Sequence, residues 1–271
     1  MIQVNSRNPP KAPESGAWLL FHMALSSDWR RVTRGCRWLF YSRSYSSEAC
    51  PLKLINTKDY ENSPEAVIIL AHGAGAPADS PFMGLLSAAL ESQGLTSLRF
   101  EFPYMQKRRE DGKRRPPDRQ PVLLDFFSGV VDRVRQDLGP DCRILVGGKS
   151  MGGRMASILA SERDGIAGVV CYGYPFHPPG KPDRWRTEHF SRIGCPAMIL
   201  QGTRDPFGKP QEVAGHQAEL GATRIHWLEG GDHDFRPLVR QQRSQQDLVN
   251  EAAEKTREFI DNHVLRHSRE A

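Results

Sequence analysis

The sequence predicts an α/β fold: a doubly wound, mostly parallel sheet with helices on both faces and no large lid domain. From residue 66 onward, short apolar segments typical of strands alternate with longer amphipathic segments. Such alternation implies a parallel sheet flanked by helices. Residues 67–71 are continuously apolar, as expected of a strand that is buried on both faces. The 271 residues can bury a sizeable core, and we place one domain at residues 51–267.

The individual elements follow in a regular order. Strands are predicted at residues 67–71, 96–100, 144–146, 169–172, 198–200 and 225–228. Helices are predicted at residues 81–94, 121–138, 154–160 and 248–264. The first helix begins with Pro81 directly after Ser80, which is a capping residue type. The second helix places its Leu, Phe and Val residues on one face, which is the pattern of a helix packed on a sheet.

The third predicted strand leads into the most informative motif, Gly148-Lys149-Ser150-Met151-Gly152. A strand that runs through G-x-S-x-G into a helix holds the serine in a strained turn with its hydroxyl exposed. The residues two positions before and after that serine must be small because strand, turn and helix crowd together. Gly148 and Gly152 meet this need. The motif predicts Ser150 as a nucleophile at a helix N-terminus, although a match in isolation also fits a surface turn.

An acid and a histidine follow the last two predicted strands. Asp205 and His233 each lie in a turn just beyond a strand, where catalytic groups collect in open α/β sheets. A serine hydroxyl requires a base, and His233 would take its proton while Asp205 orients the imidazole. Asp232 and Asp234 flank the histidine, but adjacent side chains rarely turn toward the far ring nitrogen. Taken singly, Asp205 also fits a turn-capping residue and His233 an exposed loop histidine.

A glycine-rich loop follows the first predicted strand, with the sequence His72-Gly73-Ala74-Gly75-Ala76. Loops of this kind supply one oxyanion donor, and the residue after the nucleophile supplies the other. Here the donors would be the N–H groups of Ala74 and Met151, which would stabilise the charge of a tetrahedral intermediate. This loop contains no G-x-G-x-x-G and has no Gly-Lys-Ser/Thr ending, so phosphate binding by it is disfavoured. We expect His72 itself to be structural.

These motifs resemble the α/β-hydrolase superfamily. Within it they are similar to a family that includes the testis-expressed hydrolase-like protein of animals, a subunit of a lysine-acetyltransferase complex and bacterial dienelactone-hydrolase-like proteins. The resemblance extends from residue 52 to residue 265 and includes, besides the loops above, Gly173–Gly180, Leu200–Asp205 and Trp227–Glu229. It implies the α/β-hydrolase fold with a Ser-Asp-His site, and it implies no particular substrate.

We therefore expect a serine hydrolase that acts on an ester-like bond of a small soluble substrate through an acyl-enzyme, without a metal or other cofactor. Acyl transfer, thioester cleavage and peptide cleavage remain open within this class. The alternative is a non-enzymatic interaction module, as the acetyltransferase-complex relative suggests. Such a module would not need all three of Ser150, His233 and Asp205. The oligomeric state cannot be inferred.

Composition argues against several other classes. The net charge of +5 is weak support for nucleic-acid binding, and no nucleic-acid module accompanies it. The five cysteines are odd in number and lack C-x-x-C spacing, which disfavours a disulfide framework or a zinc site. This cysteine usage favours a reducing compartment, so we expect a cytoplasmic protein. No apolar run approaches transmembrane length, and no membrane partner is expected.

Residues 1–50 differ from the rest of the chain. They contain seven Arg or Lys, eight Ser and only three acidic residues, and no secretory segment is evident. We expect a disordered basic extension, which could arise from an upstream start codon with Met23 as the true start, or an organelle transit peptide. Deleting residues 1–50 should leave the melting temperature and the activity intact, because the segment lacks the apolar periodicity needed to join a core. A large fall in melting temperature would contradict this.

Two further segments follow predicted strands. Residues 104–121 carry seven basic and three acidic side chains, which fits either recognition of an anionic substrate or a solvated, mobile loop. Between Tyr172 and Ala197 lies a proline-dense segment that can hardly build a helical lid, because proline breaks helix interiors. We expect a compact loop there, in which Phe176 and His177 either line the substrate cleft or pack the loop.

Overall fold

The structure is a computed structural model, and it describes residues 54–56 and 64–266. The extension predicted at residues 1–50 lies outside these residues, so its disorder and the exact domain bounds stay predictions. Within the described part, no helix has the length and apolar character needed to cross a membrane.

A seven-stranded sheet forms the centre of the described region, in the order β1-β3-β2-β4-β5-β6-β7. The strands are β1 (Ile55–Asn56), β2 (Ala66–Ala71), β3 (Thr96–Phe100), β4 (Arg143–Lys149), β5 (Gly168–Tyr172), β6 (Ala197–Gly202) and β7 (Arg224–Leu228). Strand β1 pairs antiparallel with β3, and all other pairings are parallel. The mostly parallel sheet predicted from the sequence is confirmed.

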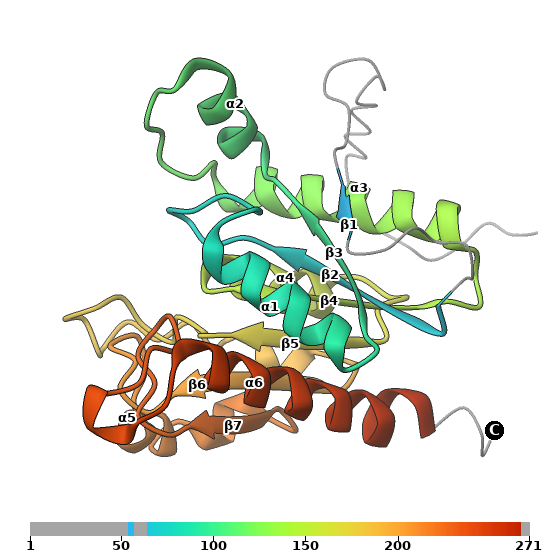
Figure 1. Cartoon of the computed structure of the whole chain (residues 1–271). Coiled ribbons are helices and arrows are strands. Elements are labelled where there is room, and N and C mark those ends of the chain that lie inside the picture. Colours follow the sequence, from blue (N-terminus) through green and yellow to red (C-terminus); the bar gives the residue numbers. More distant parts are fainter. Residues whose placement is uncertain (1–53, 57–63, 267–271) are drawn as a thin grey trace, which may run out of the picture. The chain divides into compact units, whose positions relative to one another are not determined.

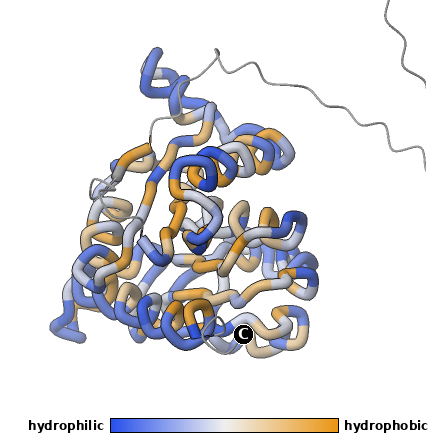
Figure 2. Tube along the Cα trace, turned by 90° about the vertical axis from the view of Figure 1, so that its right-hand side faces the viewer, coloured by the Kyte–Doolittle hydropathy of each residue, from blue (hydrophilic) through white to orange (hydrophobic). Residues whose placement is uncertain are grey.

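Helices cover both faces of this sheet. Helices α1 (Pro81–Ser92) and α6 (Gln245–Ile260) pack against one another on the face toward the viewer in Figure 1. Helices α3 (Gln120–Leu138) and α4 (Met151–Glu162) bury their apolar side chains against the opposite face. Figure 2 shows hydrophobic segments in the interior of the described region and helices that carry both hydrophilic and hydrophobic residues. Each face of the sheet therefore has its own apolar core, and the doubly wound architecture is confirmed.

The order of the strands places a topological switch point at the carboxyl edge of the sheet. The chain leaves β2 toward α1 on one face, whereas it leaves the neighbouring strand β4 toward α4 on the other face. Two adjacent strands whose connections diverge in this way leave a gap between their following loops. The loops after β2 and β4 are the two that contain the His72–Ala76 run and Ser150.

The largest difference from the sequence expectation concerns the basic segment after β3. Residues Pro103–Asp111 form helix α2 rather than a loop. Proline at the first helical position, and Gly112 with a φ of 69° directly after the last, are favourable ends for a helix. Arg109 lies 2.6 Å from Glu101 and 2.5 Å from Asp79, and these ion pairs attach α2 to the end of β3 and to the loop before α1.

The segment between β5 and β6 forms no helical lid. Over residues 173–196 the only regular element is a single 3₁₀ turn, η1 (Phe190–Arg192). The remaining short elements are α5 (Pro210–Ala214), η2 (Gln217–Leu220), η3 (Val239–Gln241) and a π-helical turn at Asp261–Leu265. The predicted absence of a large lid is therefore confirmed for the described residues.

Candidate active site

Ser150 occupies a strained turn between β4 and α4. Its φ of 52° and ψ of −115° are unusual for a residue other than glycine. A Cβ atom at Gly148 or at Gly152 would lie 2.2 Å from the carbonyl oxygen of Ala71 on the neighbouring strand. Because no side chain fits in that space, both positions require glycine. The strain is maintained by the packing around it, as is common at functional sites.

The side chains of Ser150, His233 and Asp205 are hydrogen-bonded in one line. His233 Nε2 lies 3.0 Å from Ser150 Oγ, and His233 Nδ1 lies 2.7 Å from Asp205 Oδ2. A carboxylate only accepts hydrogen bonds, so Nδ1 carries a proton and Nε2 of the neutral ring is free to accept the serine hydroxyl. The three residues come from the ends of β4, β6 and β7, which the parallel sheet brings to one edge.

Asp205 is buried and is held by hydrogen bonds that direct its carboxylate toward His233. The residue has no exposed surface. Gln201 Nε2 donates to its Oδ2 at 2.9 Å, and the Phe207 backbone N–H donates to its Oδ1 at 2.9 Å. The Phe207 ring lies with its centroid 4.4 Å from that of His233. Every lone pair that the carboxylate uses here helps to fix its direction toward the imidazole.

The two acids that flank His233 have other partners. Asp232 Oδ1 accepts hydrogen bonds from the backbone N–H groups of Asp234 and Arg236, both at 2.9 Å, which closes the turn that contains the histidine. Asp234 Oδ1 lies 3.4 Å from the ammonium of Lys149. Of the three candidate acids, the structure therefore places only Asp205 against the imidazole.

The loop after β2 lies beside Ser150. A Cβ atom at Gly73 would lie 3.9 Å from Cβ of Ser150. Among the described residues, the N–H groups of Met151 and Ala74 donate to no other protein group. The carbonyl of Ala74 accepts a hydrogen bond from Tyr104 of α2 at 3.0 Å. Two free backbone donors near the serine hydroxyl are what an oxyanion site requires.

His72 holds this loop through its side chain. Its Nδ1 lies 2.7 Å from the Gly73 carbonyl oxygen and therefore donates, while Nε2 accepts from the Phe102 N–H at 3.1 Å. Burial lowers the pKa of His72, which favours the neutral ring that this pair of contacts requires. The structure thus gives His72 a structural position, as the sequence predicts.

Lys149 is a residue whose position the sequence does not reveal. Its side chain is only 8% exposed, and its Nζ lies 3.4 Å from Asp234 Oδ1 and 5.2 Å from the ring centroid of Phe82 in α1. Burial lowers the pKa of the Lys149 ammonium, whereas the charge of Asp234 opposes this shift. Phe82 in turn packs edge-on against Phe235, which has a φ of 61°. Lys149 therefore links the serine turn, the histidine turn and the first turn of α1.

Phe176 and His177 pack the loop after β5. Phe176 has no exposed surface and contacts Tyr174, with ring centroids 5.0 Å apart. The ring of His177 is buried against Trp185, and its Nδ1 lies 3.0 Å from the Pro178 carbonyl oxygen. Of the two arrangements predicted, the structure shows packing of the loop. Contact of either side chain with substrate stays a prediction that this packing does not favour.

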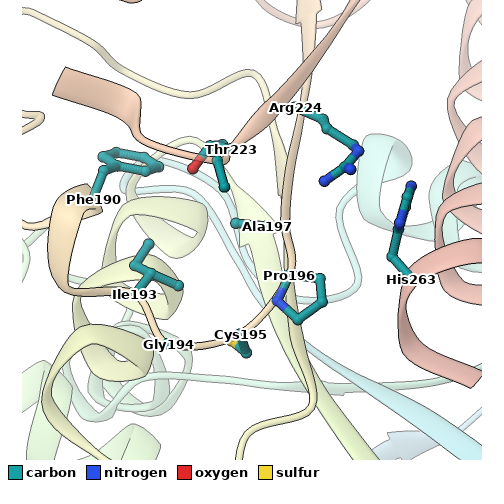
Figure 3. Close-up of a pocket in the computed structure, with 10 residues that line it drawn as sticks. Phe190, Ile193, Gly194, Cys195, Pro196, Ala197, Thr223, Arg224 and His263 are labelled. Atoms are coloured by element: carbon teal, nitrogen blue, oxygen red, sulfur yellow. The ribbon is translucent and has the colours of Figure 1, made fainter. Parts of the chain in front are cut away.

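A cavity of about 330 Å³ lies at the opposite edge of the sheet (Figure 3). Pro196 and Ala197 at the start of β6, and Arg224 at the start of β7, line it together with His263. Parallel strands place their first residues far from the edge that carries Ser150. None of the predicted site residues lines this cavity, so it is not part of the candidate active site.

Comparison with known proteins supports the fold independently. The chain is similar to a dienelactone hydrolase from Anabaena variabilis, with 18% identity, a TM-score of 0.58, and coverage of 79% of this chain and 98% of that one. A serine hydrolase without a lid from Xanthomonas campestris shows 19% identity, a TM-score of 0.57, and coverage of 77% and 88%. An α/β hydrolase of unknown function from Agrobacterium tumefaciens shows 18% identity, a TM-score of 0.61, and coverage of 79% and 93%.

Such low identities establish only a shared fold, but the family assignment goes further. Residues 64–261 match the family described as alpha/beta hydrolase domain. The matched region includes every element of the sheet except β1 and contains Ser150, Asp205 and His233. The chain therefore belongs to the alpha/beta hydrolase domain family.

Proposed function

We propose that this hydrolase is a serine hydrolase that cleaves an ester-like bond through an acyl-enzyme. The observation that carries the proposal is the continuous hydrogen-bonded line from Ser150 through His233 to the buried Asp205. This line ends at a hydroxyl in a strained turn beside two free backbone donors. A nucleophile, its base, the group that orients the base and donors for an oxyanion are the parts that acyl transfer needs.

In the first half of the reaction, Ser150 Oγ forms a bond to the carbonyl carbon while His233 Nε2 takes the hydroxyl proton. The carbonyl electron pair moves to oxygen, and the N–H groups of Met151 and Ala74 stabilise the resulting negative charge. When the tetrahedral intermediate collapses, the bond to the leaving group breaks and His233 gives its proton to the departing oxygen. Asp205 stabilises the transient imidazolium without taking its proton.

In the second half, water replaces the alcohol. His233 removes a proton from the water as its oxygen attacks the acyl-enzyme carbonyl. Collapse of the second intermediate then releases the acid and returns the proton to Ser150. The same donors serve both intermediates, so the site needs only one geometry for the whole cycle.

A fluorophosphonate probe tests this proposal directly, because it reacts covalently with activated serines. We expect the full chain to be labelled, and a Ser150→Ala variant to remain unlabelled under the same conditions. Ser161→Ala provides a matched control, since Ser161 lies later in α4 and donates to its own helix at 2.8 Å. If the wild type stays unlabelled while an unrelated serine hydrolase reacts in parallel, the alternative of a non-enzymatic interaction module replaces this proposal.

The lack of a helical lid in the described residues between β5 and β6 predicts the size of the acyl group that the enzyme prefers. The described residues between β5 and β6 form no helical lid, and the similar Xanthomonas campestris protein is itself a serine hydrolase without a lid. An enzyme without a lid needs no oil–water interface to open it, so short acyl groups should be preferred over long-chain lipids. Hydrolysis of p-nitrophenyl esters from acetate to palmitate measures this preference. A rate that climbs with chain length and jumps above the micellar concentration would contradict it.

The finer resemblance, to testis-expressed and acetyltransferase-complex hydrolase-like proteins, stays a prediction. A small-molecule substrate and a cytoplasmic location are likewise proposed for this chain rather than established.

A further inference from the structure

Two arginines, one on the helix that follows Ser150 and one in the loop after β5, have no counterion among the described residues. Arg154 lies in the first turns of α4, and Arg186 lies in the loop between β5 and β6. Neither guanidinium donates a hydrogen bond or pairs with a carboxylate within residues 54–56 and 64–266. Arg109 behaves differently, because it contacts both Asp79 and Glu101.

These two arginines are partly buried, and their segments pack together: His189, three residues after Arg186, lies 2.8 Å from the hydroxyl of Ser157, which donates to the Arg154 carbonyl at 2.9 Å. The Nε of Arg154 is buried without a hydrogen-bond partner. Burial lowers the pKa of the Arg186 guanidinium, and the positive charge of Arg154 lowers it further. A desolvated charge beside a like charge is costly when no anion compensates it. Both residues nevertheless keep part of their surface exposed, so a ligand from solvent can reach them.

The surroundings of the two residues place Arg154 relative to the serine and anchor Arg186 in its loop. Arg154 follows Ser150 by one turn of α4, which is about 6 Å along the helix axis. The Arg186 backbone N–H donates to the Phe176 carbonyl at 2.9 Å, and its carbonyl accepts from the Tyr174 hydroxyl at 2.8 Å. Both anchors belong to the buried loop that follows β5, so Arg186 is held in place although its guanidinium is unpaired.

His189 does not act as a third cation at this place. Its Nε2 lies 2.8 Å from the Ser157 hydroxyl of α4. Burial lowers the pKa of His189 to about 4, so the ring is neutral at pH 7. The exposed Glu188 is an acidic neighbour whose charge acts on Arg186, and it forms no ion pair with either arginine. The positive charge of the pair is thus left for a ligand.

We propose that Arg154 and Arg186 bind an anionic group of the substrate, a carboxylate or a phosphate, beside Ser150. This inference rests on the proposed serine hydrolase and names its substrate class: an ester that carries negative charge a few bonds from the reacting carbonyl. Guanidinium groups suit this task because their planar donors match both anions in a bidentate manner.

Selectivity between two esters of similar length tests the proposal. One is p-nitrophenyl butyrate, which is neutral, and the other is the mono-p-nitrophenyl ester of glutaric acid, which ends in a carboxylate. We expect the ratio of kcat/KM for the anionic over the neutral ester to fall about tenfold or more in Arg154→Met and in Arg186→Met, the size expected for losing a hydrogen bond between charged groups. Arg133→Met is the control, because Arg133 is exposed on α3 and pairs with Asp137 at 3.0 Å.

Thermal unfolding provides a readout that does not depend on turnover. Succinate and inorganic phosphate, compared at constant ionic strength, should raise the melting temperature of the wild type and of Arg133→Met but not of Arg154→Met. The anion with the larger effect distinguishes a carboxylate from a phosphate site. Without anion, Arg154→Met should melt no lower than the wild type, because the substitution removes an unpaired charge.

The two proposals fail in different ways. If no ester is cleaved but succinate or phosphate still stabilises the wild type selectively, the anion site stands and the serine hydrolase does not. If esters are cleaved, the selectivity ratio is unchanged in both variants and neither anion raises the melting temperature, the anion site is overturned. A lower melting temperature of Arg154→Met with an unchanged ratio would assign Arg154 a structural role instead.

Discussion

Replacing Ser150 or His233 by alanine should lower kcat for p-nitrophenyl acetate by about 10⁴-fold or more, because each change removes a group that forms or breaks a bond. Asp205→Asn should be nearly as severe, at about 10⁴-fold. An amide in place of the carboxylate can donate to Nδ1, which would stabilise the tautomer that has its proton on Nε2. That nitrogen could then no longer accept the serine proton.

The three residues should behave as one unit in this measurement. A Ser150→Ala/His233→Ala double variant should lose little beyond the worse of the two single variants, since the second change removes a group that has lost its partner. Ser161→Ala should retain wild-type turnover. Full activity in Asp205→Asn would contradict the assignment, and it would direct attention to the two acids that flank His233.

The serine turn and the hydrogen-bonded arrangement of Ser150, His233 and Asp205 could be predicted because their signals are local. A glycine-flanked serine after an apolar strand specifies its own turn, and the structure shows why: Ala71 O leaves no room for a Cβ at Gly148 or Gly152. The order of serine, acid and histidine along the chain needs only the further assumption that parallel strands end at one edge. A different argument separates Asp205 from the two flanking acids: side chains adjacent to His233 in sequence rarely turn toward its far ring nitrogen.

Helix α2 could not be predicted, because its stability depends on distant residues. Its sequence, Pro103–Asp111, is strongly polar and lacks an amphipathic pattern. The helix is held by two side chains that are buried near its start, Tyr104 and Met105, and by the ion pairs that Arg109 forms with Asp79 and Glu101. None of these contacts can be inferred from residue spacing, and the many charged residues of the segment predict a loop instead.

The burial of Lys149 and the missing counterions of the arginine pair could not be predicted from the sequence, for a related reason. From the sequence alone, a lysine before a nucleophile is expected at the surface. In the fold, Lys149 is buried against the turn that follows β7. Likewise, nothing in the sequence shows that Arg154 and Arg186 lack counterions. Whether a charge is paired depends on its tertiary neighbours, which only the three-dimensional structure shows.

Lys149 is expected to be a positioning residue for His233, and its loss gives the second large effect. Lys149→Met should lower kcat by ~10²-fold, because misplacing a catalytic group by about 1 Å can have an effect of that size. KM should change far less, since the ammonium is buried and pairs with Asp234. Asp234→Asn should have a similar effect from the other side of the contact, and Asp234 is exposed enough that the variant should fold. Lys255→Met is the control, because Lys255 forms an exposed pair with Glu258 on α6.

The double variant Lys149→Met/Asp234→Asn separates positioning from stability. Asp234→Asn leaves the buried Lys149 ammonium without this partner, and breaking a buried pair on one side is destabilising. Removing both charges leaves no unpaired buried charge, so the melting temperature of the double variant should recover relative to Asp234→Asn. Its kcat should nevertheless remain low, because the contact that joins the serine turn to the histidine turn is still missing. If kcat instead recovers together with the melting temperature, the ion pair contributes stability alone and the histidine turn holds His233 without it.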